Sequence, residues 1–345
     1  FKNKNVKYFF INLILKVFFL LPVWFLNIIF FKKPPMLRDI YLDKQTSLFL
    51  KLIEIFGYKI DTENFNNDER SKSNQARLSI AINESTPKLY SYQDILIGSK
   101  KDLLVREYIP QNIISDKTML YFHGGGYVIG SIETHHNFVS LISVILGIRV
   151  YSLEYRLAPE NKFPCALNDA KTTYQWLLEK GISSKKILLC GDSAGAHLTA
   201  SLTYELEQSN ISLPPAQILI YPMVSPSLKF ESMELFKENF LLTKASMAWF
   251  WSQLRASQDD DKNPKFNLLE QNVTYEEGVK TLLITAGFDP LCDEGKEFGK
   301  HLENFGNQVS YLHFENLFHG FVTFTNLRNA KKATMDVIKG IEEFV

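Results

Sequence analysis

Ser193 lies in a five-residue motif whose glycine spacing is typical of a serine nucleophile. The motif reads Gly191-Asp192-Ser193-Ala194-Gly195; the apolar run Lys186–Cys190 precedes it and the helical stretch Ala194–Glu207 follows. Such a strand-to-helix turn lifts the serine oxygen clear of the sheet and points the next backbone amide at the same place. The five residues also occur by chance, so it is the strand and helix around them that favour a nucleophile.

A second motif, His123-Gly124-Gly125-Gly126, directly follows the apolar run Thr118–Phe122. Glycines let the backbone approach a developing oxyanion without crowding from a Cβ atom. A phosphate-binding loop is the alternative for a glycine-rich turn, but the motif has neither a G-K-[ST] ending nor a G-x-G-x-x-G pattern. We therefore expect its backbone N–H groups to stabilise an oxyanion.

A serine hydroxyl becomes nucleophilic when a base accepts its proton. His319 follows the last strand-like run, Gln308–Phe314, and lies in a loop from which its ring can reach back to Ser193. The other histidines downstream of the serine fall in helical or strand-like patterns and have structural explanations; they are His197, His301 and His313. His319 is therefore the predicted base.

The base needs an acid that fixes its tautomer; when the serine lies on a strand-to-helix turn of this kind, the acid follows it in the chain and the histidine comes last. Asp289 comes just past the apolar run Thr281–Thr285, at the carboxyl end of an expected strand. Its neighbours Asp293 and Glu294 are the main rivals. We predict that Asp289 orients the histidine.

Short β-type runs and helix-length segments alternate from about Tyr90 onward. This rhythm predicts an α/β fold, with a mostly parallel central sheet flanked by helices on both faces. The first two runs are close enough in sequence to form a hairpin. The expected strands are Asp94–Gly98, Leu103–Ile109, Thr118–Phe122, Arg149–Leu153, Lys186–Cys190, Gln217–Tyr221, Thr281–Thr285 and Gln308–Phe314, and the clearest helices are Asn137–Leu146, Ala166–Lys180 and Ala194–Glu207.

The N-terminal run Tyr8–Phe31 is far more hydrophobic than the rest of the chain and contains one charged residue, Lys16. As a helix it would be about 36 Å long, enough to cross a bilayer core of about 30 Å. We predict a single-pass membrane anchor within residues 1–33 and a membrane-associated protein, with the side of the membrane undecided. An interfacial helix and a buried cap helix are the alternatives.

Charge and cysteine content exclude some other classes of site. The chain has 38 basic and 38 acidic residues and no basic stripe, so a nucleic-acid partner is not expected. Cys165, Cys190 and Cys292 are far apart and include no C-x-x-C pair, which indicates neither a disulfide framework nor a zinc site. No metal or organic cofactor is expected.

Several segments together resemble one known family, the hormone-sensitive-lipase-like α/β-hydrolases, and within it the arylacetamide deacetylases. They occur in the family's order between Leu120 and Phe321, as YFHGGGYVIG, EYRLAPENKFPCALNDA, GDSAGAHL, ENFLLTKASMAWFWSQL, GFDPLCDEG and HGF. The resemblance implies the α/β-hydrolase fold and an oxyanion hole made by the amides of Gly124, Gly125 and Ala194. Two positions depart from the family: Cys292 replaces the usual arginine, and the usual Ser-Pro-Leu is absent near Phe266–Leu268.

The resemblance also implies a helical cap over the site. The core would comprise residues 90–224 and 276–345. The cap would comprise residues 34–89 and the insertion 225–275, which is helical in pattern and rich in Phe, Met and Trp.

Together these features predict a serine hydrolase, a carboxylesterase or deacetylase that cleaves small to medium apolar acyl esters or aryl amides through an acyl-serine intermediate. A lipase acting on long-chain acylglycerols is the alternative among enzymes. A ligand-binding receptor on the same fold is the alternative outside enzymes. That class would lack the nucleophile or the base, whereas this sequence has both.

Overall fold

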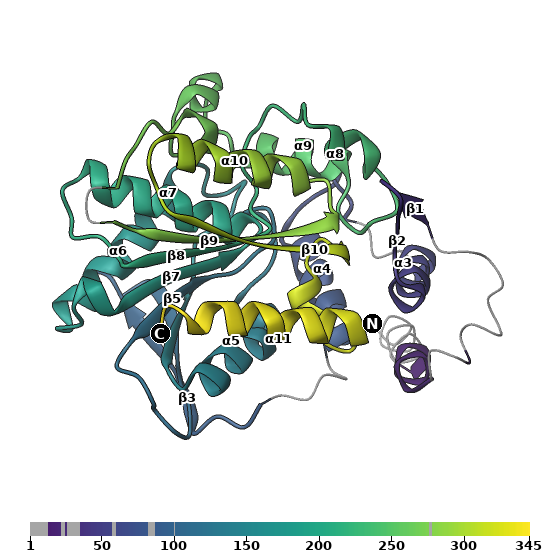
Figure 1. Ribbon diagram of the computed structural model, residues 1–345, viewed down its shortest axis with the longest axis horizontal. Helices are drawn as coiled ribbons and strands as arrows, with labels where there is room; N and C mark the ends of the chain where they lie inside the picture. The colour runs from purple at the N-terminus through teal and green to yellow at the C-terminus, as the bar shows by residue number, and fades with distance from the viewer. Residues whose placement is uncertain are drawn as a thin grey trace.

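The computed structural model describes residues 13–21, 25, 35–56, 60–81, 87–99, 101–275 and 278–345. An eight-stranded sheet with the order β10-β9-β8-β7-β5-β6-β4-β3 forms its centre (Figure 1). Strands β5 to β10 pair in parallel, whereas β4 pairs antiparallel with both β3 and β6. The predicted mostly parallel sheet is therefore confirmed, including its first hairpin. The strands are β3 Ser91–Ile97, β4 Leu103–Ile109, β5 Thr118–Phe122, β6 Arg149–Glu154, β7 Ile187–Asp192, β8 Ala216–Ile220, β9 Lys280–Phe288 and β10 Val309–Phe318.

Helices cover both faces of this sheet, as predicted (Figure 1). Because side chains alternate along a strand, Leu120 and Phe122 of β5 join the apolar cluster beneath α6 and α7, while Met119 and Tyr121 join the cluster beneath α5 and α11. Both faces of the central strands are thus buried, which explains their nearly continuous apolar sequences. The flanking helices are α5 Ile132–Leu146, α6 Cys165–Glu179, α7 Ala194–Gln208, α10 Cys292–Asn304 and α11 Arg328–Glu342, with short 3-10 turns at Ser184–Lys186 and Phe321–Thr323.

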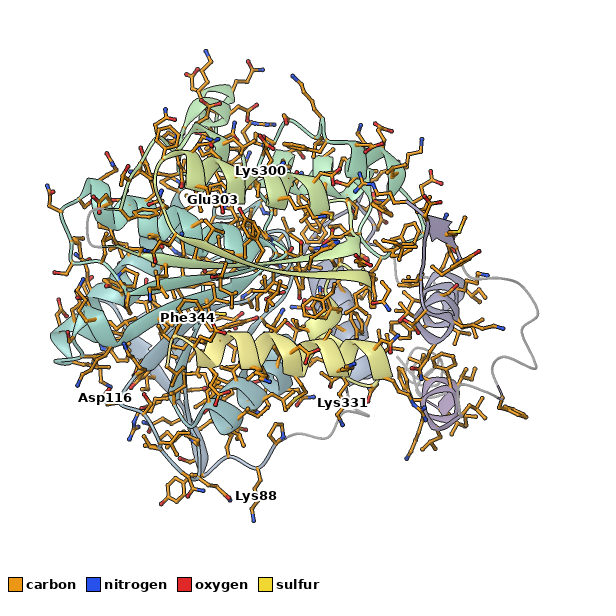
Figure 2. The ribbon with its side chains drawn as sticks, viewed as in Figure 1. Lys88, Asp116, Lys300, Glu303, Lys331 and Phe344 are labelled. Atoms are coloured by element: carbon orange, nitrogen blue, oxygen red, sulfur yellow. The ribbon has the colours of Figure 1, made fainter. Side chains whose placement is uncertain are left out.

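The outer sides of these helices are charged. Lys300 and Glu303 of α10 and Lys331 of α11 are exposed to solvent (Figure 2). The helices are therefore amphipathic, with one apolar face on the sheet and one polar face outside.

Two further segments reach the end of the sheet where β9 and β10 finish (Figure 1). One is the insertion between β8 and β9, with α8 (Glu231–Leu235) and α9 (Lys244–Leu254) at this end; the chain after α9, with the 3-10 turns Gln258–Lys262 and Leu268–Glu270, runs back over α7. The other is N-terminal, with the hairpin β1 (Met36–Leu37) and β2 (Ile40–Tyr41), and the helices α3 (Lys44–Phe56) and α4 (Asn67–Ala81).

The two segments touch each other. The ring of Phe65, just before α4, packs edge-on against Trp249 of α9, with centroids 4.9 Å apart. This contact fits a cap built from both segments. Its limits at residues 34–89 and 225–275 stay a prediction.

The predicted membrane anchor is contradicted. Within the part of the chain that the structure describes, no helix is long and apolar enough to cross a membrane. Among the described residues of this run, 13–20 are helical. Leu15 and Phe18 are buried in an apolar cluster with α3, and the ring of Phe19 lies 5.8 Å from that of Phe49. The remainder of Tyr8–Phe31, apart from residues 21 and 25, lies outside the described residues.

Phe49 tests whether α3 is an integral part of this core. It is fully buried, and its ring contacts Phe318 and Phe324 near the end of β10. Phe49→Ala should lower the free energy of unfolding by about 3–5 kcal/mol, measured by urea denaturation. Ile55→Ala is the matched control, because Ile55 is on the same helix but 75% exposed; it should change stability by less than about 0.5 kcal/mol. Equal effects of the two substitutions would show that α3 contributes no core packing.

Candidate active site

Three side chains from different loops meet in one hydrogen-bonded chain. The Ser193 hydroxyl lies 2.9 Å from His319 Nε2, and His319 Nδ1 lies 2.8 Å from Asp289 Oδ2. Ser193 follows β7, Asp289 follows β9 and His319 follows β10, so all three stand at carboxyl ends of parallel strands. Asp289 is fully buried, and the other two are 8% exposed. The structure therefore brings together the three residues that the sequence singled out.

The backbone at Ser193 takes a conformation that non-glycine residues rarely adopt, with φ 54° and ψ −117°. A Cβ atom on Gly191 would lie 2.2 Å from the carbonyl oxygen of Gly195, and one on Gly195 would lie 1.9 Å from that of Phe122. Both glycines are therefore required by close approach of backbone to backbone. The Ser193 N–H donates to the carbonyl of Ile220 at 2.8 Å, which ties the turn to the end of β8.

The imidazole of His319 is held from two sides. Asp289 accepts from Nδ1 through one oxygen, and its other oxygen accepts the N–H of Leu291 at 2.8 Å. The ring of Tyr221, which follows β8, lies 4.7 Å from the imidazole centroid at an angle of 60°. Tyr221 was not among the predicted site residues, because no sequence pattern marks it.

Gly124 differs from its predicted role. Its N–H donates to Asp192 Oδ1 at 2.8 Å, so it is not free to bind an oxyanion. Burial by itself raises the pKa of Asp192. Nearby His135 and the hydroxyl of Tyr121, which donates at 2.6 Å, lower the pKa by a larger amount. The pKa of Asp192 is thus held well below its usual value, and the carboxylate stays ionised. The sequence showed three equivalent glycines and could not reveal this long-range contact.

Three other amides in this region remain available. In the described part of the structure, the N–H groups of Gly125, Gly126 and Ala194 have no hydrogen-bond acceptor. The carbonyl of Gly125 accepts from the N–H groups of Val128 and Ile129 at 3.1 and 3.0 Å, which fixes the loop. The free amides thus include two of the three predicted oxyanion donors, Gly125 and Ala194, together with Gly126; that they bind an oxyanion stays a prediction.

His123 supports the loop from behind. It is fully buried, its Nδ1 lies 2.9 Å from the carbonyl oxygen of Gly124, and its ring stacks on Tyr155 at 4.3 Å. Burial lowers the pKa of His123 to about 3, so the ring is neutral at physiological pH. The presence of His123 in the motif is therefore explained by its packing behind the loop.

The rival residues have other partners. Asp293 accepts hydrogen bonds from Arg38 and from the backbone N–H of Ser232, and Glu294 accepts the N–H of Val224 at 2.7 Å. The other downstream histidines are also engaged elsewhere: His197 with Tyr127 and Phe266, His301 with Gln271, and His313 with Thr285. Cys165, Cys190 and Cys292 are free thiols, and among the described residues no His, Cys, Asp and Glu side chains cluster in a way that could hold a metal ion.

Glu294 gives a prediction about stability and pH. Burial raises its pKa to about 8 from the usual 4.5, so the folded protein keeps a proton that the unfolded chain has already lost. The free energy of unfolding should therefore fall as the pH rises from about 5 to about 8. In Glu294→Gln the side chain still accepts from Val224 but cannot ionise. The wild type should lose on the order of a few kcal/mol of unfolding free energy over this pH range, and this variant should not.

Urea unfolding of both proteins at the two ends of this pH range measures the difference. If the wild type and Glu294→Gln lose the same stability across the range, Glu294 does not carry the buried proton.

Known proteins with similar sequences and structures share this fold. A family model described as the alpha/beta hydrolase fold matches residues 119–323. The chain is 28% identical over 285 residues to an ethyl acetate hydrolase of Pseudomonas putida, covering 80% of this chain and 89% of that protein. It is 31% identical over 308 residues to the carboxylic ester hydrolase LipN of Mycobacterium tuberculosis, covering 85% and 80%.

A solved structure of an ester hydrolase from the metagenome of Lake Arreo superposes with a TM-score of 0.79 at 25% identity, covering 90% of this chain and 99% of that one. A receptor is also similar. The gibberellin receptor GID1C of Arabidopsis thaliana is 26% identical over 271 residues, covering 71% of this chain and 78% of the receptor.

Proposed function

This chain belongs to the α/β-hydrolase family whose model it matches, and we propose from that premise that Ser193, His319 and Asp289 are its catalytic triad. Its relatives include named ester hydrolases, and it is a serine carboxylesterase. The observation that carries the assignment of the three residues is their unbroken hydrogen-bonded chain, with links of 2.9 and 2.8 Å.

In the proposed reaction, His319 accepts the proton of Ser193 as its oxygen attacks the carbonyl carbon of an ester. Asp289 keeps Nδ1 protonated and stabilises the imidazolium that forms. The oxyanion is bound by the amides of Gly125, Gly126 and Ala194, and one such donor contributes about 2.7–4 kcal/mol. His319 then donates its proton to the leaving alcohol. Water activated by the same histidine hydrolyses the acyl-serine.

We infer that the substrates carry small to medium apolar acyl groups, as esters or aryl amides. The support is the apolar insertion at the carboxyl end of the sheet. Its large side chains are mostly buried, among them Met233, Phe236, Phe240, Met247, Phe250 and Trp251. Phe250 packs directly on the loop of free amides, because a Cβ atom on Gly126 would lie 2.3 Å from its ring. Because this side chain lies against the oxyanion loop, it restricts the space beside the loop, which supports a short acyl chain.

Receptor function is the rival outside enzymes. A receptor that only binds a ligand does not need a serine activated by a histidine. Here both residues are present in hydrogen-bonding geometry. The receptor of Arabidopsis therefore supports the fold more than the function.

Ser193→Ala should lower kcat for p-nitrophenyl butyrate by roughly four to six orders of magnitude, because attack then has no oxygen nucleophile. Its thermal unfolding should stay close to that of the wild type. Near-normal turnover by this variant would overturn the mechanism.

Asp289→Asn should lower kcat far more than it raises KM, because the imidazole loses its acceptor and its orientation. Asp293→Asn and Glu294→Gln are the matched controls in the first turn of α10, and both should keep most of the wild-type kcat on acetate esters. A larger loss in either control than in Asp289→Asn would move the acid to that residue.

Acyl length tests the substrate class. Each buried methylene should add about 0.8 kcal/mol, so kcat/KM should rise over the first few carbons. It should then fall beyond about eight carbons, once the chain outgrows a small-molecule pocket. A series of p-nitrophenyl esters from acetate to palmitate measures this. A continuous rise to palmitate would favour the lipase alternative.

A further inference from the structure

Arg38 joins three parts of the chain that are far apart in sequence. It stands in the tight turn of the β1–β2 hairpin, where both Arg38 and Asp39 have positive φ. Its guanidinium donates to both carboxylate oxygens of Asp293 at 2.9 and 2.8 Å, and to Glu231 at 2.8 Å. The N-terminal hairpin is thereby tied both to α8 of the insertion and to α10 of the core.

Asp293 and Ser232 lock α8 to the loop that carries Asp289. The Ser232 N–H donates to Asp293 Oδ2 at 2.9 Å, and the Asp293 N–H donates to Ser232 Oγ at 3.1 Å. The Ser232 hydroxyl donates to the carbonyl oxygen of Pro290 at 2.7 Å. Pro290 directly follows Asp289, so the start of α8 is bonded to both ends of the short acid-bearing turn.

Apolar contacts continue beneath these polar ones. The ring of Phe236, at the end of α8, lies 5.7 Å from that of Phe288, and Phe240 lies 5.6 Å from it. Phe288 is the residue before Asp289. A shift of α8 would therefore separate an aromatic contact immediately next to the acid.

We propose that Arg38, Glu231, Ser232 and Asp293 form a latch that holds α8 against the turn after Asp289 and so limits the length of acyl chain the enzyme accepts. The proposal rests on the proposed function, since it concerns how that site selects its ester substrates. Arg38 acts here as a specificity-determining residue without touching the substrate.

A single exposed ion pair would contribute too little energy for this role, but the Arg38–Asp293 pair of the latch is bidentate and partly buried. The Arg38–Asp293 contact is bidentate, and the two side chains are only 33% and 23% exposed. Burial raises the pKa of Asp293, but hydrogen bonds from Arg38 and Ser232 outweigh it, and the net pKa lies below the usual value. The carboxylate therefore stays charged at neutral pH.

Arg38→Met tests the latch, because methionine keeps the apolar stem and loses the guanidinium. Asp293→Asn is the second variant, since asparagine still accepts from Ser232 but carries no charge. Arg255→Met is the matched control. Arg255 pairs with Asp261 at 2.6 Å; this arginine is 27% exposed, much like Arg38, its aspartate is more exposed at 45%, and both residues lie within the insertion.

The readout is the ratio of kcat/KM for p-nitrophenyl dodecanoate to that for p-nitrophenyl acetate. Arg38→Met and Asp293→Asn should each raise this ratio about fivefold, the size expected when a partly buried ion-pair network is broken. The double variant should do no more than Arg38→Met alone, because both single changes remove the Arg38–Asp293 contact and Arg38→Met also removes the contact to Glu231. Arg255→Met should leave the ratio unchanged.

An unchanged ratio in both latch variants, an equal change in Arg255→Met, or additive effects in the double variant would each overturn the latch. Two controls establish the proposed function first: the wild type should hydrolyse p-nitrophenyl acetate, and the Ser193→Ala variant should not. If those two conditions fail, the proposed function itself is wrong, and the two failures are thereby separated.

Discussion

The turn at Ser193 is the constraint on which the rest of the site depends. Its positive φ presents the hydroxyl beyond the end of β7, and this is possible only because Gly195 packs against the backbone of Phe122 at the end of β5. The same close approach brings the triple-glycine loop, which follows Phe122 directly, next to the nucleophile. The ionised Asp192, one residue before Ser193, then holds Gly124 of that loop. Nucleophile and oxyanion donors are thus positioned by one turn.

The segments over the site are bonded to the loops that carry its chemistry. Arg70 of α4 donates to the carbonyls of Val128 and Ala158, beside the oxyanion loop. Phe250 of α9 lies on Gly126, and Ser232 of α8 is bonded to the turn that follows Asp289. The residues that cover the site therefore also support the loops that carry its chemistry. A change in the cap far from the serine is transmitted to the amides or to the acid through contacts that can be named.

Much of this site could be predicted because its residues are marked by local patterns. Ser193 and the glycine loop are short motifs at strand ends, and Asp289 follows directly on a strand, whereas Asp293 and Glu294 come a helical turn later. What failed depends on contacts between distant residues. Hydropathy could not tell that Leu15 and Phe18 pack on protein, and nothing local distinguished Gly124 from Gly126. The latch was equally hidden, since Arg38 and Asp293 are 255 residues apart.

The central claim is that Ser193 is the one residue that becomes acylated, and covalent labelling tests it most directly. A fluorophosphonate should form a single adduct per chain, mapped by peptide mass spectrometry to Ser193, with ester hydrolysis lost in proportion to labelling. His319→Gln should slow this labelling by orders of magnitude, because the serine then lacks its base. Complete inhibition with the adduct on another residue, or equally fast labelling without His319, would contradict the account.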